Sequence, residues 1–144
     1  MSNRNAPEGN IFGMILRGEI PSYPVYEDGQ VFAFLDIYPQ APGHTLVVPR
    51  SYSENILAAT EEEIAACIKA VRLLQPALAQ VTGAKGVTVV TNTGREAGQM
   101  IEYLHFHLIP RNPGDNVSLQ HVGAAADPDE LAQMAQKIKA ALQY

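Results

Sequence analysis

The sequence lacks several features that place a small protein outside the cell, in a membrane or on a nucleic acid. It has one cysteine among 144 residues, so no disulfide can form within the chain. No uncharged apolar run approaches the length of a membrane span, and the opening MSNRNAPEGN lacks the apolar core of a secretory signal. The net charge of -5 lacks the positive excess of a nucleic-acid binder. We expect a cytoplasmic protein without membrane or nucleic-acid partners.

What the sequence does contain is enough apolar material for one core. Hydrophobic residues make up 47% of the chain, and a chain of this length can bury a core without disulfides or a structural metal. It shows no internal repeat and no linker, so we expect one domain that spans residues 1–144. Cys67 falls in phase with Ile64, Ile68 and Val71 on a helical apolar face, which indicates a buried thiol.

Apolar spacing predicts three helices. The first is short and covers residues 10–19. The second is long and begins where Thr60 and Glu63 form a capping-box pattern. Pro76 lies inside that pattern, so we expect a kink or a restart there. The last helix starts after Asp127 and runs to the C-terminus.

Five further segments have the composition and the flanking turns of strands. They are residues 25–28, 31–37, 44–49, 86–92 and 103–110. Strands followed by a helix and then by more strands favour an α+β fold with a mainly antiparallel sheet. Residues 110–127 show no readable pattern.

The last predicted strand, YLHFHLIP, carries two of the four histidines. Successive side chains of a strand face opposite ways, so Tyr103, His105 and His107 share one face. The apolar residues that alternate with them share the other face, which packs on the core. Taken alone, the histidine face has an ordinary alternative, which is exposure to solvent.

Other polar residues favour a site over a plain surface. His44 follows a Pro-Gly corner at the start of one strand, and Asp36 is a lone carboxylate at the end of another. The loop before the histidine segment holds residues that can bind an anion: Asn92, Gly94, Gly98 and Gln99. If the strands pair side by side, these groups converge on one patch.

Such a patch suits nucleophilic attack on phosphorus. A neutral imidazole is a good nucleophile, titrates near neutral pH and can be held in one tautomer by a hydrogen bond at its other nitrogen. Of two neighbouring histidines, one can attack while the other binds phosphate oxygens and handles a proton.

The segments GEIPSYPVYEDGQVFAFLDIYPQAPGHTLVVPR and TNTGREAGQMIEYLHFHLIPR resemble the histidine triad (HIT) family of nucleotide hydrolases and transferases. The resemblance runs from about residue 11 to residue 111 and leaves residues 112–144 as a C-terminal extension. It implies a HIT-like α+β fold with a five-stranded antiparallel sheet and a long packing helix. It also implies a homodimer that binds a small nucleotide containing AMP, without a cofactor.

The resemblance implies roles for individual residues. His105 matches the histidine that attacks the α-phosphate and forms a covalent nucleotidyl-histidine, which water then hydrolyses. His107 matches the histidine that contacts the phosphate and the leaving group, and His44 matches one that contacts the motif from the neighbouring strand. Asp36 matches the acceptor for the ribose hydroxyls. The remaining implied contacts are to the base, from Phe34 and Ile37, and to the phosphate, from the loop with Asn92, Gly98 and Gln99.

Two departures from the family pattern concern turnover. The first motif position holds Tyr103, and a phenol stays neutral near pH 7 because its unperturbed pKa is about 10. If this position only orients the nucleophile, tyrosine serves; if it must carry a proton, turnover falls. Met100 stands where relatives commonly have a hydroxyl residue, so a phosphate contact worth on the order of 1 kcal/mol is missing.

A third departure concerns metal. Many bacterial relatives carry a Cys-x-x-Cys pair in the first helix as half of a zinc site. Asn10 and Gly13 occupy those positions here, and Tyr52 stands where relatives have a further histidine. We therefore expect no structural zinc.

Three interpretations remain open. The first is a hydrolase that cleaves a nucleoside phosphoramidate or a related ester or anhydride of AMP. The second is a nucleotide-binding module whose turnover is weak or lost because of Tyr103 and Met100. The third is a zinc site of His44, His105 and His107, which would leave the carboxylate and the glycine loop without a role. Three further polar residues are expected at the solvated surface: Arg95, Arg111 and His121.

Overall fold

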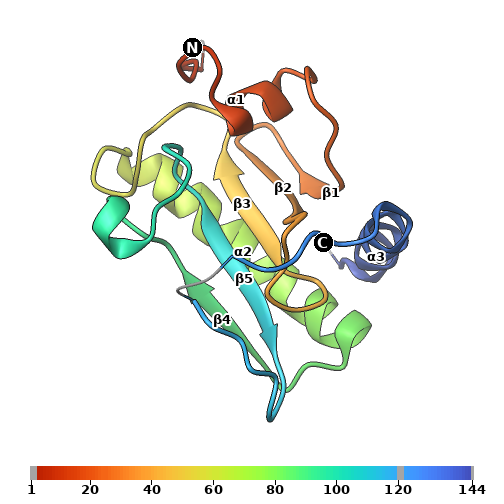
Figure 1. Cartoon of the computed structure of the whole chain (residues 1–144). Helices are drawn as coiled ribbons and strands as arrows, with labels where there is room; N and C mark the ends of the chain where they lie inside the picture. The colour runs from red at the N-terminus through yellow and green to blue at the C-terminus, as the bar shows by residue number, and fades with distance from the viewer. Residues whose placement is uncertain (1–2, 120–121, 144) are drawn as a thin grey trace.

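The computed structural model describes residues 3–119 and 122–143 and confirms the α+β class (Figure 1). Five strands form an antiparallel sheet in the order β1-β2-β3-β5-β4. The strands are β1 (Pro24–Glu27), β2 (Val31–Leu35), β3 (Thr45–Pro49), β4 (Gly86–Val90) and β5 (Phe106–Arg111). The helices are α1 (Ile11–Leu16), α2 (Glu61–Thr82) and α3 (Pro128–Ala141), with a 3-10 turn η1 (Arg95–Ala97) between β4 and β5.

Two apolar layers cover the two faces of the sheet. The larger layer joins α2 and α3 to the sheet and contains Leu104, Phe106 and Leu108. Figure 1 shows α2 running along this face. The smaller layer joins Phe12 of α1 to the opposite face and contains Tyr103. The alternation predicted for the histidine segment is therefore confirmed, and α1 lies on the histidine side of the sheet.

The histidine segment enters the sheet later than its pattern predicts. β5 starts at Phe106, because β4 ends at Val90, opposite His107, and the last two residues of β3 pair only with β2. Side-chain hydrogen bonds hold residues 103–105 where backbone pairing with the neighbouring strands is absent. Thr91 Oγ1 donates to the His105 carbonyl at 2.7 Å, and the Tyr103 hydroxyl donates to the Pro49 carbonyl at 2.6 Å.

Local sequence signals set the start and the course of α2. Thr60 Oγ1 accepts from the Glu63 N–H at 3.1 Å, and Glu63 Oε1 accepts from the Thr60 N–H at 2.8 Å, so the capping box is confirmed. The helix continues through Pro76 to its end without a restart. Cys67 is fully buried, as expected. By length and hydropathy alone α2 resembles a membrane span, but its apolar face packs on the sheet.

The other element ends differ modestly from the predictions. α1 is shorter than expected, and residues 36–37 and 91–92 lie in loops rather than in strands. As predicted, Asp127 caps α3, because its Oδ2 accepts from the Glu130 N–H at 3.1 Å. His121 lies outside the described residues.

Candidate functional site

The sheet brings three histidines together where β3 and β5 lie side by side. His107 of β5 is paired with Leu46 of β3, and His44 precedes Leu46 by two positions, so both histidines lie on one face. His44 Nε2 is 3.0 Å from His107 Nδ1. The ring centroids of His105 and His107 are 4.8 Å apart. The three imidazoles form one contiguous group.

Hydrogen bonds fix the position of the proton on each imidazole. The Gln40 N–H donates to His44 Nδ1 at 3.0 Å, so the proton of His44 is on Nε2, where it donates to His107 Nδ1. His107 consequently carries its own proton on Nε2. The Tyr103 carbonyl lies 2.6 Å from His105 Nδ1 and can only accept. This leaves His105 with its lone pair on Nε2.

Burial keeps the three imidazoles neutral at physiological pH. Desolvation, with a smaller contribution from His105, lowers the pKa of His44 to about 4 and that of His107 to about 3. Burial also lowers the pKa of His105, although its bond to the Tyr103 carbonyl opposes the shift. A neutral imidazole keeps the lone pair that nucleophilic attack requires.

Asp36 places a carboxylate beside the histidines. Its N–H donates to the His44 carbonyl at 2.9 Å and closes the β2–β3 loop, residues 36–44. Its Oδ1 accepts from the Tyr38 N–H at 2.9 Å, and its Oδ2 lies 3.7 Å from His44 Nε2. Burial raises the pKa of this carboxyl, although the Tyr38 N–H opposes the shift. Oδ2 thus faces the histidines, where it can accept from a ligand hydroxyl.

The side chain of Gln99 holds the loop between β4 and β5 together. Its Oε1 accepts from the Gly94 N–H at 2.9 Å. Its Nε2 donates to the carbonyls of Glu54 at 2.6 Å and Ile101 at 3.1 Å. Because Gln99 is buried and bonded in this way, its side chain shapes the loop from within. Its amide is engaged with the protein, in contrast to the phosphate contact that the resemblance implies.

Asn92 and Gly98 lie against each other across the same loop. Gly98 has a φ of 95°, and a β-carbon there would lie 2.9 Å from Asn92 Nδ2. Glycine is required for both the backbone conformation and this close approach. Met100, at the position of the missing hydroxyl, is 75% exposed.

The two arginines beside the histidine segment have different surroundings. Arg95 is exposed on η1, as expected. Arg111 is partly exposed, as expected, and is also bound to the protein. Its Nε donates to Asp115 Oδ2 at 2.8 Å, and its Nη1 donates to Thr88 Oγ1 at 3.1 Å.

The two residues expected beside the base are not brought together. Phe34 is buried and packs edge-on against Phe12, with ring centroids 5.5 Å apart. Ile37 is 46% exposed on the β2–β3 loop. Phe12 also contacts the His105 ring, with centroids 5.0 Å apart and an interplanar angle of 85°. The sequence does not reveal the contact between Phe12 and His105, because the apolar spacing around Phe12 predicts only the buried face of a helix.

Tyr103 contacts His105 through its carbonyl, whereas its phenol points into the protein. The hydroxyl donates to the Pro49 carbonyl at 2.6 Å, and the ring packs against Tyr52 with centroids 5.3 Å apart. Burial raises the pKa of this phenol. The hydroxyl is therefore a neutral donor that is committed to the main chain at the end of β3.

Asp36, His44 and His107 also have the spacing of a metal site, since one ligand atom of each lies within 4.8 Å of the others. The hydrogen bond from Gln40 argues against this use. With an N–H facing Nδ1, His44 needs its proton on Nε2, which is the atom that would face the cation. The same objection applies to a site made of the three histidines. The donor set does not fit a divalent cation.

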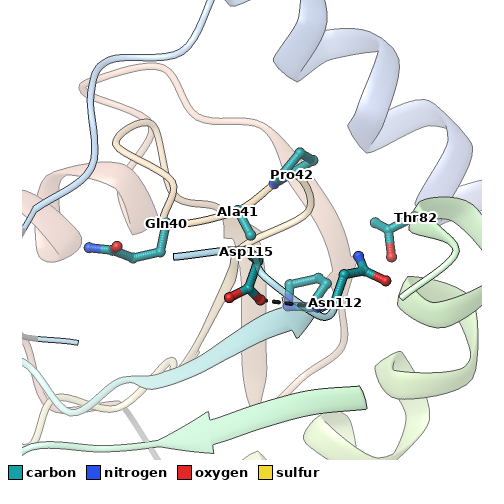
Figure 2. Close-up of a pocket in the computed structure, with 7 residues that line it drawn as sticks. Gln40, Ala41, Pro42, Thr82, Asn112 and Asp115 are labelled. Atoms are coloured by element: carbon teal, nitrogen blue, oxygen red, sulfur yellow. Dashed lines mark hydrogen bonds between the residues drawn. The ribbon is translucent and has the colours of Figure 1, made fainter. Parts of the chain in front are cut away.

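A small cavity borders the β2–β3 loop (Figure 2). Its volume is about 140 Å³, and it separates the loop from the end of α2 and from the turn after β5. The labelled residues in Figure 2 are Gln40, Ala41, Pro42, Thr82, Asn112 and Asp115. The charge of Asp115 is already paired with Arg111. The cavity therefore leaves open space beside the β2–β3 loop. Asp115 adds no unpaired carboxylate there.

Comparisons with known proteins show what the chain is similar to. The sequence model of the HIT domain matches residues 17–114. An uncharacterized HIT-like protein of Methanocaldococcus jannaschii is 46% identical over 105 residues, which cover 73% of this chain and 81% of that protein. The adenosine 5'-monophosphoramidase of Candida albicans is 30% identical over 134 residues, which cover 90% of this chain and 88% of that protein.

A solved structure is similar over nearly the whole chain. The crystal structure of a HIT-like protein from Bartonella henselae superposes with a TM-score of 0.87 at 41% sequence identity. The match covers 96% of this chain and 100% of that one. The similarity thus includes α3 as well as the sheet that carries the histidines.

Proposed function

Because the chain belongs to the HIT domain family, we propose that it is a nucleotide hydrolase with His105 as its nucleophile. The proposed substrate is a nucleoside phosphoramidate, or a related ester or anhydride of AMP, and the name of the Candida relative supports this class. The observation that carries the proposal is a pair of complementary tautomers. His105 has a lone pair on Nε2, whereas His107 has a proton on Nε2. Attack on phosphorus uses both.

In the first step, His105 Nε2 attacks the α-phosphorus, and the bond from phosphorus to the leaving nitrogen or oxygen breaks. His107 Nε2–H donates a hydrogen bond to the phosphoryl group, and the leaving group takes up a proton from solvent as it departs. The Tyr103 carbonyl stabilises the nucleotidyl-imidazole, because its bond to Nδ1–H strengthens as the ring becomes positive. The His44 Nε2–H holds His107 in the tautomer that makes this donation.

Water completes the reaction in a second step. It attacks the same phosphorus, loses a proton to solvent and displaces His105. AMP is released, and His105 returns to its neutral form with the lone pair on Nε2. The sum of the two steps is the hydrolysis of one bond to phosphorus.

We propose that the nucleoside lies at the Asp36 end of the site. Asp36 Oδ2 accepts from the ribose hydroxyls, since it faces the histidines and its partner oxygen is already bonded to Tyr38. Ile37 is exposed beside it and offers an apolar contact to the base, with Phe34 supporting the sheet beneath. The phosphate oxygens meet the loop of Asn92 and Gly98, which Gln99 holds in shape.

The surroundings of Tyr103 favour a hydrolase over a nucleotide-binding module. We propose that Tyr103 occupies the first position of the histidine triad. The group that orients His105 is a main-chain carbonyl, which tyrosine supplies as well as histidine does. The absent hydroxyl at Met100 removes one hydrogen bond, on the order of 1 kcal/mol, and leaves the nucleophile in place.

Release of AMP from adenosine 5'-phosphoramidate tests the proposal. We expect release by the wild type and none by His105→Asn, with AMP bound by both proteins. AMP binding without release by the wild type would favour the binding module. A wild type that neither binds nor releases AMP would overturn the assignment to nucleotides.

We further propose that the protein is a homodimer, as the family resemblance implies. Val89 is 41% exposed on β4, which is an edge of the sheet. Ile68 is 45% exposed beside Ile64 in an open groove of about 500 Å³ along α2. A second copy would cover both apolar surfaces. Sedimentation equilibrium should give twice the mass of the chain, and a monomer at micromolar concentration would contradict the dimer.

A single domain over residues 1–144 and a cytoplasmic location also stay predictions. Limited proteolysis tests the first, and a stable, active fragment that ends near residue 111 would contradict it. Fractionation of cells that express the full chain tests the second.

A further inference from the structure

The segment that precedes α3 contacts the candidate site, although the match to the HIT domain ends at residue 114. We call residues 122–127 the crossing segment, because they cross the β2–β3 loop. In Figure 1 the blue chain ahead of α3 passes beside the orange loop between β2 and β3. The Ala126 N–H donates to the Ile37 carbonyl at 3.0 Å.

Gly123 brings the crossing segment against the same loop at a second place. A β-carbon on Gly123 would lie 2.1 Å from the Pro39 carbonyl oxygen and 2.8 Å from the Tyr38 carbonyl oxygen. Both neighbours are main-chain atoms, so no flexible side chain can move aside. Any residue other than glycine must displace either the loop or the crossing segment.

The loop supplies two hydrogen bonds that shape the site. The Tyr38 N–H holds Asp36 Oδ1 at 2.9 Å, and the Gln40 N–H holds His44 Nδ1 at 3.0 Å. The second bond decides which nitrogen of His44 carries the proton. Through His44 Nε2 it also decides the tautomer of His107.

The crossing segment contacts the opposite ends of the same two peptide groups. The Ile37 carbonyl and the Tyr38 N–H belong to one peptide group, and the Pro39 carbonyl and the Gln40 N–H belong to another. A peptide group is planar, so its carbonyl cannot turn without turning its N–H. A contact that fixes each carbonyl therefore fixes the direction of the donor behind it.

We propose that the crossing segment is a positioning element of the site. Ala126 fixes the peptide group that orients Asp36, and Gly123 fixes the peptide group that orients His44. The cavity of about 140 Å³ beside Gln40 leaves the second group room to turn when the Gly123 contact is lost (Figure 2). The effect on rate rests on the proposed function, whereas the effect on the His44 tautomer does not.

Gly123→Ala tests the proposal, with Gly29→Ala as the matched control, because a β-carbon on Gly29 meets open space. Ring-nitrogen chemical shifts report the tautomer of His44. We expect Gly123→Ala to lose the single Nε2-protonated form and Gly29→Ala to keep it. We also expect kcat for AMP release to fall about tenfold to a hundredfold in Gly123→Ala, with a much smaller change in KM.

Wild-type ring shifts in a folded Gly123→Ala protein would overturn the proposal, whatever its rate. A wild type that does not release AMP would overturn the proposed function, and the ring shifts would still test the positioning. If the variant does not fold, amide hydrogen exchange in the wild type decides. The amides of Gln40 and Ala126 should open with the same free energy and denaturant dependence. Protection of Gln40 with free exchange at Ala126 would contradict the coupling.

Discussion

His105 and His107 are the same residue type two positions apart in the chain, yet they offer opposite groups at Nε2. The difference arises at Nδ1, where His105 meets the Tyr103 carbonyl, an acceptor, and His107 meets the His44 N–H, a donor. In the proposed mechanism the first imidazole attacks phosphorus and the second donates a hydrogen bond. At the residue scale, the division of labour depends on these partners more than on the side chains themselves.

The phenol of Tyr103 should affect stability more than catalysis. In Tyr103→Phe the Pro49 carbonyl loses a donor at a buried position, which we expect to lower the free energy of unfolding by about 1–3 kcal/mol. The carbonyl that holds His105 remains, so kcat should stay within about threefold. Urea unfolding and AMP release measure the two effects.

Tyr52→Phe is the matched control for that variant, because the Tyr52 hydroxyl makes no hydrogen bond within residues 3–119 and 122–143. It should leave both the free energy of unfolding and kcat near the wild-type values. A loss of kcat of about a hundredfold in Tyr103→Phe, with unchanged unfolding, would place the hydroxyl in the chemistry instead.

The buried imidazoles should also make stability depend on pH. In the unfolded chain His44 and His107 titrate near 6.5, whereas in the folded protein their pKa values are lowered to about 4 and about 3. The unfolded state therefore binds more protons across this window. Stability that is present above pH 6.5 is lost as the pH falls, by at most about 1.4 kcal/mol per pH unit for each group. Urea unfolding between about pH 7 and pH 4.5 measures the slope, and an equally steep slope in His107→Gln would contradict this origin.

At the scale of elements, patterns that are local in the sequence predict the structure well. The capping box of Thr60 and Glu63 and the two faces of YLHFHLIP depend only on nearby residues, and both are confirmed. The start of β5 could not be predicted in this way. A strand exists only where a neighbouring strand pairs with it, and the end of β4 and the partners of β3 are set elsewhere in the chain.

The candidate site also combines features that the local sequence predicts with contacts that only the folded chain makes. The residue types and places of His44, His105 and Asp36 in the sequence make them candidates for the site, together with the loop and the family resemblance. Gln40 acts through its main-chain N–H, which no side-chain pattern reveals. Gln99 is recognisable as part of the loop, but its bonds to Glu54 and Ile101 come from the folded chain.

The loop between β4 and β5 carries a further prediction. In Gly98→Ala the new β-carbon would lie 2.9 Å from Asn92 Nδ2 at a positive φ, so the loop must rearrange at a cost of about 1–3 kcal/mol. We expect AMP binding to weaken about tenfold or more, measured by calorimetry. Gly86→Ala on β4 is the control, since its β-carbon would meet open space. Equal AMP affinity in both variants would exclude the loop from the phosphate site.

At the scale of the whole molecule, the sheet has its main apolar core on one face and the candidate site on the other. α2 and α3 pack on one face, and the histidines lie on the other face together with α1. The site is then completed by segments far apart in the sequence: the β2–β3 loop, the loop between β4 and β5, and the crossing segment ahead of α3. The crossing segment, which lies after the residues matched by the HIT domain, thus contacts the β2–β3 loop of the candidate site directly.

The central claim is that His105 becomes covalently bound to the nucleotide during turnover. The most direct test is mass spectrometry of the protein quenched in alkali during the first turnover of adenosine 5'-phosphoramidate, followed by peptide mapping. The account predicts one AMP group, confined to the peptide with His105 and absent from His105→Asn. Turnover by the wild type with the adduct on another residue, or with no adduct at any quench time, would contradict it.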